Sequence, residues 1–131
     1  MKFLLDTDSV SFSLRGEGRV AERIRGHGSS ELGISSITLA ELRFGADLRH
    51  SNRLHRLIDG FIAGVRVLPF DDRVAQRYGV VAASLQRQGQ CIGNMDTLIA
   101  AHALVEGLVL VTHNQTHFSR IRGLKMDDWY A

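Results

Sequence analysis

Residues 93–118, GNMDTLIAAHALVEGLVLVTHNQTHF, contain the pattern that decides the fold. The pattern predicts a polar turn, an amphipathic helix over 94–107 with Asp96 near its start as the cap, and a strand over 108–111. A short, wholly apolar run such as LVLV is typical of a strand buried on both faces of a parallel sheet. Ligands of open α/β sheets bind beyond the carboxyl ends of the strands. The polar loop from Thr112 to His117 and the Asp96 carboxylate are therefore expected at one functional edge.

The composition is that of one ordinary globular domain. The chain has 131 residues, of which 44% are hydrophobic and 23% charged, enough for a single core. The lone Cys91 excludes an internal disulfide framework and suits a reducing compartment. No apolar run approaches the length of a membrane span, and no secretory signal opens the chain. We therefore expect a cytoplasmic protein without a membrane partner.

The small net charge of +2 hides an excess of arginine in the first half of the chain. Arginine accounts for 14 of the 16 basic residues, and eight of these lie between Arg15 and Arg56. The planar guanidinium group suits phosphate, so this bias favours contact with a polyanion such as nucleic acid. A solvated surface with no such partner is the alternative.

The remaining sequence alternates between strand and helix patterns. Helices are predicted over 9–15, 19–25, 36–49, 52–65, 71–88 and 94–107, and strands over 2–5, 32–35, 67–70, 108–111 and 124–126. In the 36–49 helix, the apolar positions Ile37, Ala40, Phe44 and Leu48 lie on one stripe, which Glu41 borders. This alternation predicts a single α/β domain with a mostly parallel central sheet flanked by helices.

Three carboxylates are expected at the carboxyl edge of that sheet. Asp6 ends the first strand, Glu41 lies in the first two turns of the 36–49 helix, and Asp96 begins its helix. Carboxylates brought to about 4 Å repel by roughly 4 kcal/mol per pair, unless a cation holds them together. A set of hard oxygen ligands suits Mg²⁺ or Mn²⁺, which can activate water against a phosphodiester. The alternatives are that Asp6 or Asp8 only caps the next helix, and that Glu41 is a solvated carboxylate.

Four sequence stretches resemble the successive motifs of PIN-domain ribonucleases, and more closely those of VapC-type toxins from bacterial toxin–antitoxin pairs. The stretches are LLDTD at 4–8, SSITLAELRFGA at 35–46, IGNMDTLIAAHAL at 92–104, and LVTHNQTHFSRIRGL at 110–124 followed by DDW. Each string is weak alone, but the four occur in order and span the chain. The resemblance implies a PIN-like fold with Asp6, Glu41 and Asp96 as its acidic centre.

The resemblance also implies an activity and partners. Such proteins use Mg²⁺, for which Mn²⁺ can substitute, to cleave RNA, often structured translation RNA such as tRNA. They are inhibited by a cognate VapB-like antitoxin. A homodimer within the toxin–antitoxin complex, touching DNA only through the antitoxin, is expected here.

The fourth acidic position of the family departs from the pattern. Asn114 and His117 occupy places where similar proteins often have an acid. Asn114 can still orient water, whereas His117 puts a strong second metal ion in doubt. A catalytically degenerate PIN fold that binds RNA or protein is therefore the alternative function.

Other polar residues are expected to have supporting roles. Thr7, Asp8 and Thr112 are candidates for hydrogen bonds or water-mediated contacts to the acidic centre. Arg43 could contact RNA phosphate, with a surface ion pair as the alternative. His102, on the helix of Asp96, is expected to be a packed histidine.

Overall fold

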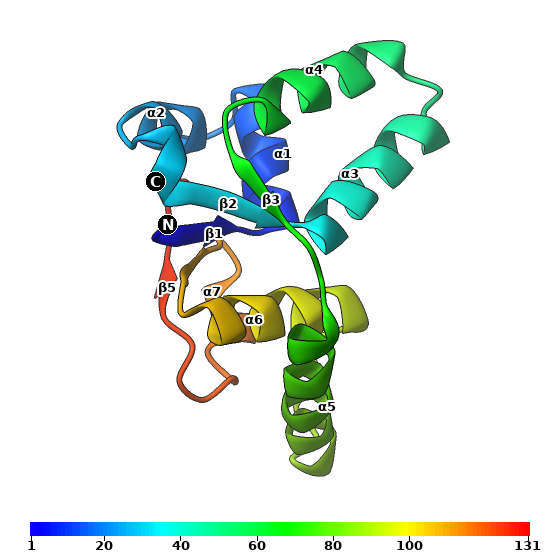
Figure 1. Ribbon diagram of the computed structural model, residues 1–131, viewed down its shortest axis with the longest axis vertical. Helices are drawn as coiled ribbons and strands as arrows, with labels where there is room; N and C mark the ends of the chain where they lie inside the picture. The colour runs from blue at the N-terminus through cyan, green and yellow to red at the C-terminus, as the bar shows by residue number, and fades with distance from the viewer.

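A five-stranded parallel sheet forms the centre of the computed structural model, which describes all 131 residues (Figure 1). The strands are β1 (Phe3–Leu5), β2 (Leu32–Ser35), β3 (Arg66–Leu68), β4 (Val109–Val111) and β5 (Met126–Asp127). Their order in the sheet is β3-β2-β1-β4-β5, and every neighbouring pair is parallel. The chain therefore winds outward in both directions from β1. The crevice beyond the carboxyl ends of β1 and β4 lies at this switch point, where open α/β sheets bind ligands.

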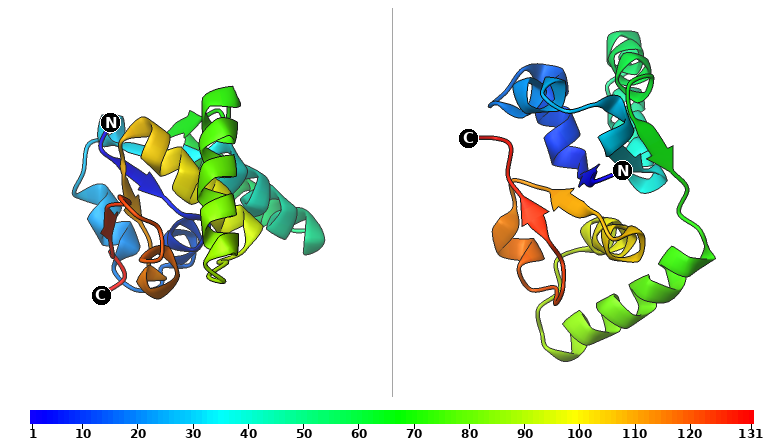
Figure 2. Two further views of the ribbon diagram at one scale, coloured as in Figure 1. Left: turned by 90° about the horizontal axis from the view of Figure 1, so that it is seen from below. Right: turned by 60° about the vertical axis from the view of Figure 1, so that its left-hand side comes forward.

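Helices cover both faces of the sheet (Figures 1 and 2). One face carries α1 (Thr7–Arg15), α2 (Val20–Arg25), α3 (Ser36–Leu48) and α4 (Asn52–Ile62), and the other carries α5 (Asp72–Arg87), α6 (Asn94–Glu106) and α7 (Gln115–Phe118). A 3₁₀ turn at Ser29–Glu31 leads into β2. None of the helices is both long enough and apolar enough to cross a membrane. The predicted α/β class and parallel sheet are confirmed.

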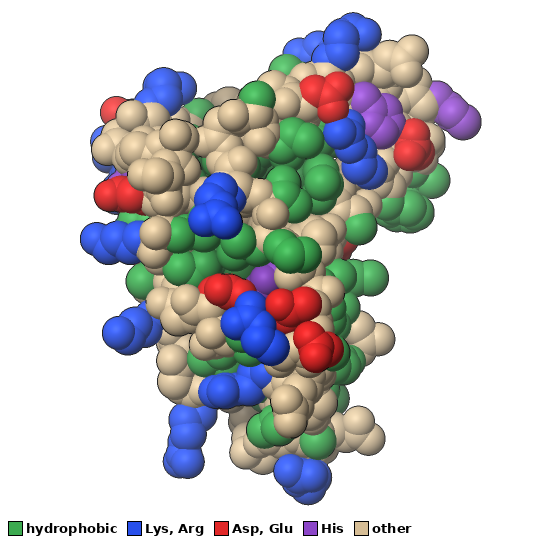
Figure 3. Space-filling model, in the orientation of Figure 1, with side chains coloured by type: hydrophobic (Ala, Val, Ile, Leu, Met, Phe, Trp, Pro, Cys, Tyr) green, Lys and Arg blue, Asp and Glu red, His purple; other side chains and the backbone are tan.

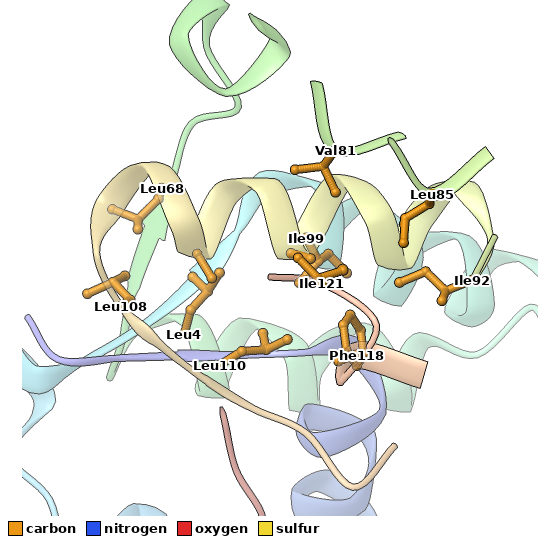
Figure 4. Packing of buried hydrophobic residues seen from close by; sticks show 12 residues of the cluster. Leu4, Leu68, Val81, Leu85, Ile92, Ile99, Leu108, Leu110, Phe118 and Ile121 are labelled. Atoms are coloured by element: carbon orange, nitrogen blue, oxygen red, sulfur yellow. The ribbon is translucent and has the colours of Figure 1, made fainter. Parts of the chain in front are cut away.

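Alternation along the strands divides the core into two clusters. Leu4 and Leu110 pack with α5, α6 and α7, and Figure 4 shows them below the helix that carries Ile99, with Phe118 to one side. Their strand neighbours, such as Leu5 and Val111, pack on the opposite face with α1 to α4 and the buried Trp129. Successive side chains of a strand point to opposite faces, so a wholly apolar run is needed when both faces are covered.

The apolar stripe of α3 is buried only at its start. Ile37 packs against the core, whereas Phe44 and Leu48 are 67% and 68% exposed. The buried positions of the helix are Thr38, Leu42 and Ala46. The α3–α4 hairpin projects beyond the sheet (Figure 1), so the outer part of the stripe faces away from the core.

The helix predicted over 94–107 ends where expected, but its predicted N-terminal cap is wrong. Gly107 ends the helix with φ 66°, in the left-handed region where glycine lacks the Cβ penalty. Asp96 does not cap the helix: the N-cap is Gly93, whose carbonyl accepts a 2.6 Å hydrogen bond from the Thr97 hydroxyl. Asp96 lies in the first turn instead, which leaves its carboxylate free of a capping role. The loop expected at 112–117 also contains the start of the short α7.

Candidate active site

Asp6 is buried at the point where β1 passes into α1. Its side chain is the N-cap of α1, and Oδ1 accepts a 2.8 Å hydrogen bond from the Ser9 amide. Burial raises the pKa of Asp6, and the charge of Asp8 adds to this effect. The side chains of Thr112, which follows β4, and of Ser9, together with the Ser9 amide, act in the opposite direction. Asp6 thus performs the capping role that the sequence allowed and also faces the switch point.

Asp96 lies among the other acids predicted for the site. Burial first, and then the negative charges of Asp6, Asp8 and Glu41 in that order, together raise the pKa of Asp96 to about 6. The charge of His117 acts in the opposite direction. Since such interactions fall with distance, the fold brings together residues that are up to 111 positions apart in the chain.

Glu41 reaches this edge through Thr7. The Thr7 hydroxyl donates a 2.5 Å hydrogen bond to Glu41 Oε1 and lies 3.2 Å from Thr38 Oγ1. Thr7 directly follows Asp6, so this contact fixes α3 against the end of β1. Glu41 is therefore not a solvated helix carboxylate paired with an arginine. Thr38 was not singled out in the sequence, although it precedes Glu41 by three positions and shares its helix face.

Asn114 and His117 form a pair at the fourth position of the site. The Asn114 side-chain nitrogen lies 2.9 Å from His117 Nδ1, and the Asn114 amide donates to the Thr112 hydroxyl at 3.0 Å. Because an amide NH₂ can only donate, Nδ1 is the acceptor and a neutral His117 would carry its proton on Nε2. The loop after β4 therefore places an imidazole, not an acid, beside Asp96.

Arg43 and His102 lie away from the acids. Arg43 forms an ion pair of 2.6 Å with Asp59 on α4 and a hydrogen bond to the His55 carbonyl. This is the surface ion pair left open as an alternative. His102 is fully buried, with Nδ1 2.8 Å from Ser35 Oγ, as expected for a packed histidine. Burial lowers its pKa.

The arginine-rich first half is partly neutralised. Arg15, Arg19 and Arg43 each pair with a carboxylate. Figure 3 shows arginine and lysine side chains spread around one face of the molecule, interspersed with acids. The arginine excess thus does not form a single continuous basic patch on that face.

The acidic centre has no cationic partner of its own. None of the eight ion pairs involves Asp6, Asp8, Glu41 or Asp96. Uncompensated carboxylates with raised pKa values fit a divalent cation, and all the donors are the hard oxygens that Mg²⁺ prefers. The fit is incomplete as the side chains stand, because no three of the acids are close enough together to hold one ion. Asp6 and Asp96 are the two acids that best fit a shared ion, because Asp6 is the charge that raises the pKa of Asp96 most.

Two grooves lie on opposite sides of the sheet. The larger, about 790 Å³, lies between α5 and the segment after α7, and none of the acids lines it. The smaller, about 140 Å³, lies between α1, α3 and α4 and is lined by Thr7 and Glu41 together with Leu14, Leu54 and Ile58. Only the smaller groove opens beside a residue of the acidic centre.

The fold is that of a parallel α/β domain, and its candidate site is a set of acids beyond the carboxyl ends of β1 and β4. The family model described as PIN domain matches residues 3–124. The chain therefore belongs to the PIN-domain family, in its VapC-type branch.

Similar proteins and structures cover nearly the whole chain. The tRNA(fMet)-specific endonuclease VapC of Shigella flexneri is 37% identical over 131 residues, 98% of each chain. The structure of DNA-bound VapBC from Salmonella typhimurium contains a chain with 38% identity and a TM-score of 0.88, with 98% of both chains covered. The VapBC2 structure from Rickettsia felis, bound to a promoter fragment, also gives 0.88 at 29% identity, covering 98% of this chain and 99% of that one.

Proposed function

We propose that this chain is a metal-dependent endoribonuclease toxin of the VapBC type, which hydrolyses phosphodiester bonds in RNA. The observation that carries the proposal is the set of uncompensated acids around Asp96, whose pKa is raised to about 6. Full-length similarity to proteins named VapC endonucleases supports the same activity.

Asp6 and Asp96 are the residues that would hold Mg²⁺, with Mn²⁺ as a substitute. A bound cation of this kind activates water and stabilises the developing charge on a phosphoryl oxygen. Asp6 is pre-oriented by the Ser9 amide and the Thr112 hydroxyl, so little side-chain freedom is lost on binding. Glu41, held by Thr7, is placed to accept a proton from the attacking water or to bind through water.

The loop after β4 would position the water and the substrate. Asn114 has its amide held by the Thr112 hydroxyl and its side chain against His117, so it can present a hydrogen bond to water. His117, which acts electrostatically on Asp96, can donate to a phosphate oxygen through Nε2. Asp8 adds negative charge near both Asp6 and Asp96, and it suits a water-mediated contact to the cation.

The proposed substrate is structured translation RNA, and specifically tRNA, because two of the similar proteins are named tRNA(fMet)-specific endonucleases. Labelled initiator and elongator tRNAs are incubated with the purified chain in Mg²⁺, Mn²⁺ or EDTA, beside the Asp6→Asn variant. We expect discrete fragments that need the cation and Asp6. RNA that is bound but never cut with either cation would support the degenerate binding module instead.

A VapB-like antitoxin is the proposed partner. The small groove between α1, α3 and α4 is lined by apolar side chains such as Leu14, Leu54 and Ile58 as well as by Glu41, and Phe44 and Leu48 expose apolar surface on the same hairpin. An apolar antitoxin segment would fill the groove, and a basic side chain from it would neutralise the acids. The toxin would act in the cytoplasm and form a homodimer in the complex, with DNA contacted only through the antitoxin. Co-expression with the neighbouring reading frame tests this, and a chain that is harmless and unaccompanied would refute it.

A further inference from the structure

An ordered aromatic cluster begins at His113, the residue after Thr112, and has no part in the function argued so far. The His113 and Tyr130 rings stack with centroids 4.3 Å apart and planes 20° from parallel. Phe12 of α1 meets both rings edge-on, at 4.8 Å from Tyr130 and 5.9 Å from His113. The cluster therefore joins α1, the loop after β4 and the C-terminal segment after β5.

Asp128 fixes the two stacked rings. Its Oδ1 accepts a 2.9 Å hydrogen bond from the Tyr130 amide, and its Oδ2 lies 2.8 Å from His113 Nδ1. The Tyr130 hydroxyl donates to Glu17 at 3.2 Å. Rings held in this way lose little conformational freedom when a planar ligand binds, which lowers the cost of binding.

His113 is the ring with an available face. Its side chain is 48% exposed even though Tyr130 covers one face and Asp128 pairs with Nδ1. Since Phe12 touches it only at an edge, with planes 84° apart, the exposed area is mainly the face opposite Tyr130. A planar group stacked there would extend the Tyr130–His113 stack.

The place of His113 in the chain indicates which ligand would reach it. His113 follows Thr112, whose side chain lowers the pKa of Asp6 and so lies near it, and consecutive Cα atoms are about 3.8 Å apart. The Thr112 amide donates to the Asp127 carbonyl at 2.9 Å, so the C-terminal segment that carries Tyr130 is fixed at the same strand end. An RNA strand with a phosphate at Asp6 would thus have a neighbouring base within reach of His113.

We propose that His113, backed by Tyr130, is a stacking subsite for an unpaired nucleobase next to the scissile phosphate. The inference rests on the proposed ribonuclease function and adds a residue that positions the RNA strand. Base–aromatic stacking tolerates any base, so the subsite selects an unpaired nucleotide and not a sequence. It therefore favours loops and single strands over duplex RNA, whose bases are stacked within the helix.

His27 provides a matched control elsewhere in the fold. Its ring also stacks on an aromatic side chain, Trp129, at 4.9 Å and 6°, and also pairs with a carboxylate, Glu31, at 3.0 Å. It lies beside Phe3 at the start of β1, whereas His113 follows the carboxyl end of β4. Loss of either ring removes similar packing, but only His113 is beside the acids.

The test uses the full-length chain and short single-stranded RNA oligonucleotides with one 2-aminopurine at successive positions, in EDTA so that no cleavage occurs. Stacking quenches the fluorescence of 2-aminopurine. We expect quenching at one position, and a dissociation constant about five to fifty times weaker for His113→Ala. His113→Phe keeps a π-face without the Asp128 pair, and it and His27→Ala should bind within about twofold of the unaltered chain. His113→Leu, which fills the space without a π-face, replaces the alanine variant if that variant does not fold.

The outcomes separate this inference from the proposed function. An unaltered chain that neither binds nor cleaves RNA overturns both. If RNA is cleaved normally and His113→Ala binds it as tightly as the unaltered chain, only the stacking subsite is wrong. If His113→Phe binds as weakly as His113→Ala, the ion pair with Asp128 matters instead of the ring, and the stacking subsite is also wrong.

Discussion

Replacing Asp96 by Asn should stabilise the metal-free protein at neutral pH and leave its stability nearly unchanged in acid. Burial and the charges of Asp6, Asp8 and Glu41 raise the pKa of Asp96 from 3.8 to about 6. The folded state therefore holds this proton more tightly than the unfolded chain does. The resulting stability is fully present below about pH 4 and is lost as the pH rises through about 6. An amide at position 96 cannot ionise, so the variant does not undergo this loss.

The size of the effect follows from the shift. A difference of about two pKa units corresponds to about 3 kcal/mol at most. Asp96 is partly exposed, and screening by solvent lowers the expected gain in unfolding free energy to about 1–2 kcal/mol. For a chain of this length, that gain corresponds to a rise in Tm of roughly 3–8 °C. Added Mg²⁺ should stabilise the unaltered protein more than the variant, because the cation binds the folded acids.

Thermal unfolding followed by circular dichroism, in EDTA at about pH 4.5 and pH 7.5, measures the gain. Asp72→Asn is the matched control, because Asp72 is exposed in the first turn of α5. It should lose about 0.3–1 kcal/mol of favourable helix-dipole interaction, a change of opposite sign. An Asp96→Asn protein that gains nothing at pH 7.5, or gains equally at pH 4.5, would show that uncompensated charge does not surround Asp96.

Three further substitutions test the site and the partner surface. Asp6→Asn should lower RNA cleavage by more than about a hundredfold while preserving the fold, because Asn also caps helices well; normal cleavage by a folded variant would remove Asp6 from the metal site. His117→Glu should lower the ratio of Mn²⁺- to Mg²⁺-supported cleavage rates, since carboxylate suits Mg²⁺ better than imidazole does; an unchanged ratio would mean that position 117 does not contact the cation. Phe44→Ser should weaken antitoxin binding by about tenfold or more, while the equally exposed Val80→Ser on α5 should not; equal effects in a titration of the purified antitoxin would exclude the α3–α4 surface.

Patterns within a few residues predicted most of the secondary structure. The apolar runs predicted the strands, and the helices predicted over 71–88 and 94–107 agree with α5 and α6 to within one residue at each end. These features depend on hydrogen bonds and backbone conformations between chain neighbours. The acidic centre was predicted because Asp6 ends a strand, Asp96 lies at the start of a helix, and Glu41 lies in the first two turns of the helix that follows a strand. In a parallel sheet, such positions meet at one edge.

Which side of α3 is buried could not be predicted in the same way. An apolar stripe can face either the core or the solvent, and only packing against other elements decides that Leu42 is buried and Phe44 exposed. The same limit applies to Arg43, whose partner Asp59 lies on another helix. Burial and ion pairing depend on which element covers a side chain, and a local pattern contains no information on that.

The sequence by itself determined the parallel α/β fold, because the fold follows from local periodicity, and it predicted the three acids from their places near strand ends and from the order of the motifs. Only the tertiary structure decided the surroundings of those acids: the Ser9 amide holds Asp6, Thr7 holds Glu41, and the charges of both acids raise the pKa of Asp96. It alone also placed Tyr130 against His113, since stacking between distant segments requires the β4–β5 pairing that fixes the C-terminal segment beside the site.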